Sequence, residues 1–146
     1  MIRQIIKLAL LACFSLSVRA SRLDLNAARL KEITGEHIYA DELEFDNMEI
    51  HSVAPDTFSA VKKTIVYMDL SFNKLTSLPY NVFSGLEKIK KIDLGSNSLE
   101  SIDKRTFSGL STLEEIKLKK CGLKTIEQGT FDGLSNLKSL DLSMKH

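Results

Sequence analysis

The chain has 146 residues, of which 43% are hydrophobic and 27% are charged, and its formal net charge is +1. This length and composition fit one folded domain and exclude a disordered tail. The small net charge gives no strong attraction to phosphate backbones or anionic lipids, so we expect no nucleic-acid partner.

Residues 1–20 have the pattern of a secretory signal peptide. Arg3 and Lys7 precede an apolar stretch from Leu8 to Phe14, and small residues stand at both cleavage-recognition positions before Ser21. We predict cleavage after Ala20 and an extracellular mature chain. The alternative, a buried N-terminal helix, would find nothing in the following pattern to cover it.

Removing this leader takes away three cations and no acid, so the net charge changes from +1 to −2. The apolar stretch is too short for a permanent membrane helix, and we expect no membrane segment in the mature chain. Cys13 leaves with the leader, which makes Cys121 the only cysteine and excludes an internal disulfide. Stability must therefore come from another source, and the stacking of repeats is the candidate.

Residues 21–42 are predicted to form a degenerate repeat or cap. The apolar positions Leu23, Leu25, Leu30, Ile33 and Ile38 suggest a compressed unit. We expect its strand to join the same sheet as the later strands and to present Arg22, Asp24 and Asn26 on that sheet's polar face.

Repeats then dominate the chain, because Phe83, Phe107 and Phe131 stand 24 residues apart and the apolar positions around them recur in step. We assign four units to residues 43–136 and a truncated fifth to 137–146. The first complete unit has the apolar and asparagine positions Ile65, Met68, Leu70, Asn73, Leu75, Leu78, Phe83 and Leu86.

The segments MDLSFNKLTSLPYNVFSGL and IDLGSNSLESIDKRTFSGL resemble the leucine-rich repeats of extracellular proteins, whose pattern is LxxLxLxxNxLxxLxxxxFxxL. The resemblance covers Leu43 to Leu142, and the repeats are similar to those of Toll-, Slit- and chaoptin-type ectodomains. It implies an α/β horseshoe, a solenoid with a parallel β-sheet on the concave face and a mostly irregular or short helical convex side. Proteins of this kind recognise other proteins.

The same architecture follows from the residues. Alternation at Met68-x-Leu70 and Ile92-x-Leu94 predicts short strands with one buried face. Successive units would lay these strands side by side in parallel, and the rest of each unit would supply the crossover. No unit can bury its leucines alone, so each depends on its neighbours.

Asn73, Asn97 and Cys121 occupy the same position in successive units, where the chain leaves the strand. We expect them to form a structural ladder in which buried side chains donate hydrogen bonds to free backbone carbonyls. For Cys121, a reactive thiol or an intermolecular disulfide is the alternative to a buried, weakly donating side chain.

The last residues end just after a predicted strand, and Lys145 stands at the ladder position. An apolar repeat without a polar cover leaves a strand edge exposed. We expect either that the chain is a fragment of a longer protein or that a partner covers this edge, including a second copy by self-association.

The polar face of the sheet is the predicted ligand-binding surface. Tyr67 and Phe72 are either aromatic anchors for a partner or residues packed on a neighbouring repeat, and the acidic stripe is either a site for a basic partner or a solvated face. The candidate residues are Glu44, Tyr67, Asp69, Phe72, Lys91, Asp93, Lys117 and Lys119.

The three histidines pair with no metal ligand or nucleophile at motif spacing, so we expect no catalytic residues, no metal and no cofactor. We predict a protein-binding module for adhesion, reception or innate-immune-type recognition, with a receptor, a ligand or a matrix component as its partner. The alternative is a non-catalytic subunit that stabilises a secreted enzyme.

Overall fold

The computed structural model describes residues 23–34 and 41–144, and every structural statement below refers to these residues. The predicted signal peptide lies outside them. Among them no helix has the length and apolar character needed to span a membrane.

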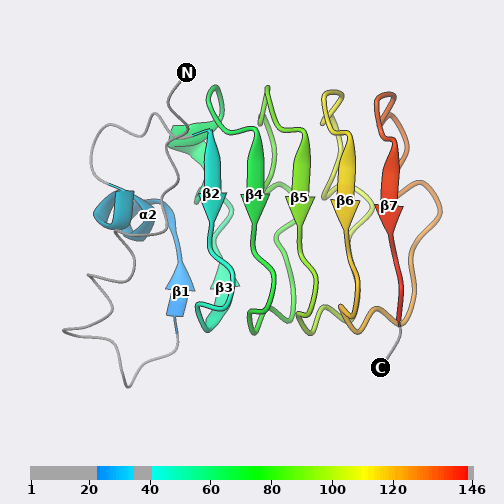
Figure 1. The fold of residues 1–146 in the computed structure, drawn as a ribbon, viewed down its shortest axis with the longest axis horizontal. Coiled ribbons are helices and arrows are strands. Elements are labelled where there is room, and N and C mark those ends of the chain that lie inside the picture. Colours follow the sequence, from blue (N-terminus) through cyan, green and yellow to red (C-terminus); the bar gives the residue numbers. More distant parts are fainter. Residues whose placement is uncertain (1–22, 35–40, 145–146) are drawn as a thin grey trace.

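Five short strands form one parallel sheet whose spatial order follows the chain (Figure 1). They are β2 (Glu42–Glu44), β4 (Tyr67–Asp69), β5 (Lys91–Asp93), β6 (Glu115–Lys117) and β7 (Ser139–Asp141). Equivalent residues pair directly, because Met68 lies opposite Leu43 on one side and Ile92 on the other. The predicted parallel solenoid is therefore confirmed.

Burial alternates along each strand, as the sequence pattern predicts. The middle residues Leu43, Met68, Ile92 and Ile116 are fully buried, while their neighbours along the strand face outward. Backbone pairing continues past the strands, since the amide of Leu70 donates to Asp93 O at 2.8 Å. Each buried leucine or isoleucine stabilises the fold by about 1.5–3 kcal/mol relative to exposure.

The return paths contain almost no regular structure. They are turns, apart from the strand β3 (Ile50–Val53) and the one-turn 3-10 helix η1 (Ser59–Val61), both between β2 and β4. Phe58, Phe83, Phe107 and Phe131 stack in one column along the solenoid, with ring centroids 6.0–6.1 Å apart. This column is why one phenylalanine recurs in every unit.

The N-terminal part differs from the prediction. Strand β1 (Leu23–Leu25) pairs with β3 (Ile50–Val53) in a separate two-stranded sheet and is followed by the helix α2 (Ala27–Thr34). The expectation that Asp24 lies on the same polar face as the later strands is wrong. Leu25 packs instead against the return path of the next unit, where Thr57 donates its hydroxyl hydrogen to Leu25 O at 3.0 Å.

Burial decreases toward the last described strand. Leu140 is 36% exposed and Met144 is 51% exposed, although Ile116, the residue paired with Leu140, is fully buried. A repeat obtains its burial from the units on both sides, and β7 pairs with β6 only.

Candidate functional site

The surface of interest is the open face, defined here as the side chains that flank the buried middle residue of each strand in the five-stranded sheet. The parallel register arranges these side chains in two rows across the strands. The rows are Glu42, Tyr67, Lys91, Glu115 and Ser139 at the strand starts, and Glu44, Asp69, Asp93, Lys117 and Asp141 at the strand ends.

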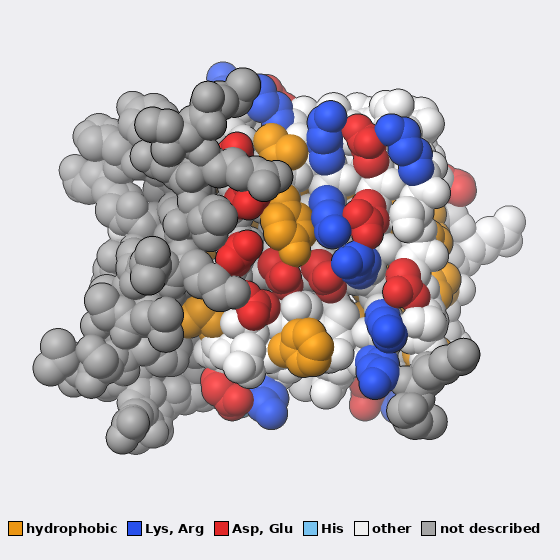
Figure 2. All heavy atoms as spheres, viewed as in Figure 1, with side chains coloured by type: hydrophobic (Ala, Val, Ile, Leu, Met, Phe, Trp, Pro, Cys, Tyr) orange, Lys and Arg blue, Asp and Glu red, His pale blue; other side chains and the backbone are white. Residues whose placement is uncertain are grey.

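Figure 2 shows acidic side chains gathered near β2 and columns of alternating charge farther along the open face. Lys91 Nζ lies 3.2 Å from a Glu115 oxygen, and Lys117 Nζ lies 3.7 Å from Asp93 and 3.8 Å from Glu115. These partly exposed pairs each contribute about 0–1 kcal/mol, so they determine the charge pattern more than the stability.

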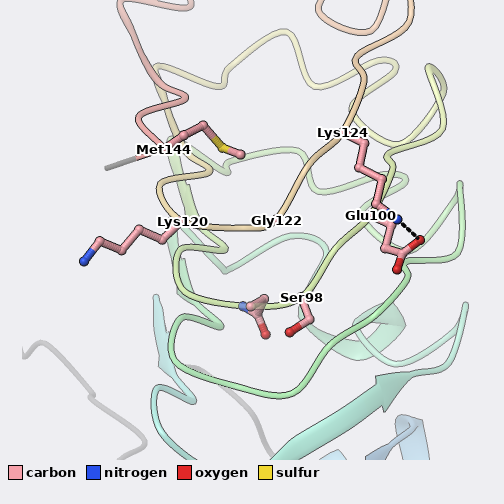
Figure 3. A pocket seen from close by; sticks show the side chains of 7 residues that line it. Ser98, Glu100, Lys120, Gly122, Lys124 and Met144 are labelled. Atoms are coloured by element: carbon pink, nitrogen blue, oxygen red, sulfur yellow. Dashed lines mark hydrogen bonds and ion pairs between the residues drawn. The ribbon is translucent and has the colours of Figure 1, made fainter. Parts of the chain in front are cut away.

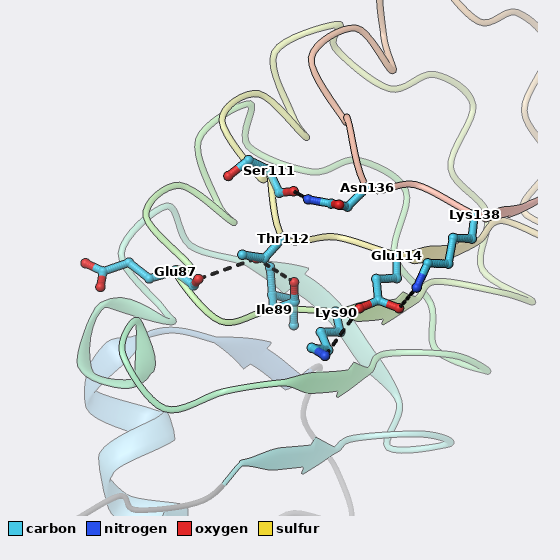
Figure 4. A network of polar contacts seen from close by, with 8 residues as sticks. All are labelled: Glu87, Ile89, Lys90, Ser111, Thr112, Glu114, Asn136 and Lys138. Atoms are coloured by element: carbon cyan, nitrogen blue, oxygen red, sulfur yellow. Dashed lines mark hydrogen bonds and ion pairs between the residues drawn. The ribbon is translucent and has the colours of Figure 1, made fainter.

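A second set of charges borders the open face at the start of the strands (Figure 4). Glu114 lies between two lysines, with its oxygens 3.3 Å from Lys90 Nζ and 2.7 Å from Lys138 Nζ. These cations lower the pKa of the Glu114 carboxyl, with Lys138 as the larger influence. The carboxylate therefore connects three successive units.

The aspartates at the strand ends have a structural contact of their own. Oδ1 of Asp69 accepts the backbone N–H of Ser71 at 2.8 Å. Asp93 and Asp141 accept the backbone N–H of Gly95 and of Ser143 in the same way. This local turn contact explains why aspartate recurs there without requiring a ligand. Burial, followed by the nearby Asp69 charge, raises the pKa of the Asp93 carboxyl.

Tyr67 is held in place by its neighbours. Its hydroxyl donates to Asp69 Oδ2 at 2.9 Å, and Lys91 Nζ lies over its ring at 5.3 Å from the centroid. Burial and the hydrogen bond to Asp69 raise the pKa of the Tyr67 hydroxyl, so it stays protonated at physiological pH. Of the two predicted readings, Tyr67 fits the packed residue more closely than the free anchor.

Phe72 fits the other interpretation, that of an exposed aromatic anchor. Its side chain is 63% exposed, and its backbone has a positive φ of 54°. Such a conformation is unusual for a bulky side chain, and Asn47 occupies the equivalent place in the preceding unit. The turn is fixed by the next repeat, because the Phe72 amide donates to Gly95 O at 2.9 Å.

The predicted site residues thus fall into two groups. The sheet brings together Tyr67, Asp69, Lys91, Asp93 and Lys117 through the contacts above, with Glu44 in register beside Asp69. Phe72 and Lys119 lie beyond the strand ends, both exposed. Glu115, which the alternation of the strand also places on the polar face, completes the charge network.

The ladder position lies beneath the turn that carries Phe72. The Asn73 side-chain amide donates to Phe45 O at 2.8 Å and to Leu70 O at 2.9 Å, while its oxygen accepts the amides of Met48 and Ile50. Asn97 repeats the arrangement one unit later, with donation to Leu70 O and Leu94 O at 2.9 Å.

Cys121 at the third ladder position makes fewer contacts. Its thiol donates to Leu94 O at 2.9 Å and also contacts the Asn97 backbone. One sulfur atom must serve both contacts, whereas Asn97 donates with its nitrogen and accepts the Leu75 amide with its oxygen. Burial raises the pKa of the Cys121 thiol to about 11. A buried, protonated thiol is a poor nucleophile, which favours the structural reading.

A hollow of about 340 Å³ lies beside the turns that follow the ladder (Figure 3). Ser98, Gly122 and Met144 border it, and Lys124 and Glu100 close one side with an ion pair of 3.0 Å. The sequence does not predict this hollow, because it forms only where two turns stack. Within the described ranges no three metal-ligating side chains come together.

The chain is similar to several solved structures, among them a Toll structure and a TLR13 structure. A Toll structure from Drosophila, in complex with Spatzle, matches with a TM-score of 0.43 and 14% identity over 84% of this chain and 22% of the other. A TLR13 structure in complex with ssRNA13 matches with a TM-score of 0.53 and 26% identity over 82% of this chain and 20% of the other. The chain therefore spans about a fifth of each.

No match is found among curated proteins. The leucine rich repeat family matches at residues 40–99 and 87–144, which together cover the whole five-stranded sheet. The repeat spacing, the parallel sheet, the phenylalanine column and this match together assign the chain to the leucine-rich repeat family.

Proposed function

We propose that this protein is a secreted or cell-surface binding module that recognises another protein through the open face of its sheet. The observation that carries the proposal is Phe72, a 63% exposed aromatic side chain at positive φ beside that face. Positive φ costs free energy for phenylalanine, and burial of the side chain offsets little of this cost. Asparagine would therefore serve the fold at least as well at this position. Exposed aromatic residues are frequent energetic centres of protein interfaces.

The charge pattern of the open face and the net charge of the chain support a protein partner. Its charges are of both signs and arranged in register across β4, β5 and β6, which suits an extended, patterned protein surface. The TLR13 structure contains ssRNA13 as the ligand of that protein. Loss of the predicted leader would leave this chain with a net charge of −2, which disfavours a phosphate backbone as its own partner.

The polar side chains of the open face have structural roles and give no indication of catalysis. Tyr67 is protonated and hydrogen-bonded, and the strand-end aspartates support turns. We therefore propose that the protein is not an enzyme and needs no cofactor.

The test is a binding screen of the secreted chain, presented as a multimer, against a panel of extracellular protein domains. For a partner found in this way, alanine at both Tyr67 and Phe72 should weaken binding by more than about 2 kcal/mol. Ile126→Ala is the matched control, because Ile126 is also an exposed apolar side chain but lies in a return path outside the open face. Equal dissociation constants for the double variant and the unaltered chain would refute the use of this face.

Extracellular location has a separate test. The full chain, expressed in secretory cells, should be recovered from the medium with Ser21 as its first residue. Retention of residues 1–20 in the recovered protein, or its accumulation inside the cell, would contradict the predicted leader.

Self-association through β7 is a further part of this proposal. Edge pairing between two copies would bury Leu140 and Met144, which are exposed in the single chain. The chain should then sediment as a dimer at micromolar concentration, and Leu140→Glu should make it monomeric. A monomer at all concentrations would remove self-association from the proposed partners.

A further inference from the structure

We propose that a second, separate site on the return-path side of the solenoid binds a neutral saccharide. A hollow of about 250 Å³ lies between two neighbouring units, at residues 80–84 of one and 105–108 of the next. It is lined by Tyr80, Asn81, Ser84, Arg105, Thr106 and Ser108. None of these residues belongs to the open face, so the inference does not depend on the proposed function.

One wall of the hollow is a flat aromatic and guanidinium pair. The Arg105 guanidinium carbon lies 4.0 Å from the centroid of the Tyr80 ring, which is itself 49% exposed. Ring surface is therefore available beside the hollow. The apolar C–H face of a sugar ring fits such a surface, because dispersion attraction is greatest between flat, closely packed groups.

The charge of Arg105 is already compensated. Asp103 accepts two hydrogen bonds from the guanidinium, at 2.9 Å and 2.8 Å, and a third from the Arg105 backbone amide at 2.8 Å. These contacts lower the pKa of the Asp103 carboxyl to about 2, so the pair stays ionised across the physiological range. A phosphate or sulfate would have to compete with this carboxylate, which favours an uncharged ligand.

The other lining groups are neutral and hydrogen-bonding. Within the described residues Asn81, Ser84 and Ser108 use only their main-chain atoms in hydrogen bonds, which leaves an amide and two hydroxyls uncommitted around the hollow. A sugar offers hydroxyl groups that both donate and accept, so it can match all three. A peptide side chain would need an aliphatic wall, and Tyr80 is the only apolar residue of the lining.

Thr106 is the most specific member of the lining. It is 2% exposed and its hydroxyl has no hydrogen-bond partner. Threonines at the equivalent position of two other units are satisfied, since Thr57 donates to Ala54 O and Thr130 donates to Glu127 O, both at 2.8 Å. A buried hydroxyl without a partner costs free energy, and rotation of the Thr106 side chain toward the hollow would let a ligand hydroxyl supply the missing partner.

The experiment measures binding of the full chain to immobilised oligosaccharides ending in mannose, galactose or N-acetylglucosamine, with a sulfated heparin fragment as the charged comparison. We expect a neutral saccharide to bind with a dissociation constant of about 1 mM or tighter. By calorimetry with that saccharide, Tyr80→Ala should weaken binding by about tenfold or more, because the only apolar surface is lost.

Thr106→Val separates binding from folding. Val82 occupies the same repeat position one unit earlier and is buried, so valine fits this environment. The variant should weaken saccharide binding several-fold while its melting temperature stays equal or rises, because an unpaired buried hydroxyl has been removed. Lys104→Ala, at the repeat position equivalent to Tyr80 but outside the hollow, and Phe72→Ala on the other side should leave saccharide binding unchanged.

Several results would overturn the proposal. They are failure of every neutral saccharide to bind, binding of the sulfated fragment only, and unaltered affinity in both Tyr80→Ala and Thr106→Val. Loss of saccharide binding in Phe72→Ala would place the site elsewhere. A partner protein whose affinity falls in Tyr80→Ala, without saccharide binding, would make this hollow part of a protein interface instead.

Discussion

At the residue scale, the ladder position shows how one side chain can connect two units. Asn73 makes hydrogen bonds to carbonyls and amides of the preceding unit and to its own turn, and all but the partly buried bond from Met48 are buried. Removal of the side chain takes this partner from Phe45 O and from the amides of Met48 and Ile50, whereas Leu70 O keeps its hydrogen bond from Asn97. Unpaired buried groups cost more than the net value of the bond.

We predict that Asn73→Ala destabilises the chain by about 3–4 kcal/mol, as measured by urea unfolding, because several buried groups lose their partner together. Asn97→Ala should cost less, since the Asn97 oxygen accepts one amide while the Asn73 oxygen accepts two. Equal losses of unfolding free energy in both variants would mean that the number of amides accepted does not determine the contribution of a ladder asparagine.

Cys121 allows the opposite experiment. Cys121→Asn should stabilise the chain by about 1 kcal/mol, because an amide could donate to Leu94 O as the thiol does and also accept a backbone amide. In the unaltered chain the thiol should react slowly with iodoacetamide when folded and rapidly in urea. Fast labelling of the folded chain would favour the reactive-thiol alternative.

The raised pKa of the Cys121 thiol also predicts that stability depends on pH. The folded pKa of about 11 lies above the usual value of 9.0, so between these values the folded chain holds a proton that the unfolded chain releases. The thiol contribution to stability is therefore constant below pH 9 and decreases as the pH rises toward 11. Unfolding free energies of Cys121→Ala, measured at the same pH values, should lack this decrease.

At the element scale, the turn after β4 combines a rigid backbone with an exposed side chain. We predict that Phe72→Asn stabilises the chain by about 0.5–1 kcal/mol, because asparagine adopts positive φ more readily than phenylalanine. The same substitution should weaken binding of the protein partner. Serine-to-asparagine exchange at Ser96, which has the same φ of 54°, is the control for the backbone effect. A destabilised Phe72→Asn would show that the phenylalanine packs in the folded chain.

At the scale of the whole molecule, stability passes from unit to unit through the phenylalanine column. Phe107 stacks on Phe83 on one side and on Phe131 on the other, each at 6.0 Å. Phe107→Ala should therefore cost about 3–5 kcal/mol in thermal or denaturant unfolding. Phe131→Ala should cost less, because Phe131 is only partly buried. Equal costs would indicate that the column transmits no stability along the solenoid.

Much of this architecture could be read from the residues, because the repeat is a short-range pattern. The 24-residue period of Phe83, Phe107 and Phe131 and the alternation around Met68 and Ile92 predicted the parallel strands that the structure contains. The period fails before Leu43, and there the prediction failed too. Nothing in the spacing of Leu23 and Leu25 distinguishes pairing with β2 from pairing with β3.

The sequence by itself determined the parallel sheet and its buried spine, since a side chain's place in a repeat sets the side on which it lies. Only the tertiary structure decided how the surface residues are used. It joined Tyr67 to Asp69 and Lys91, left Phe72 exposed, and brought Tyr80 of one unit against Arg105 of the next. Such contacts depend on rotamers and on the spacing between stacked units, and a linear pattern specifies neither.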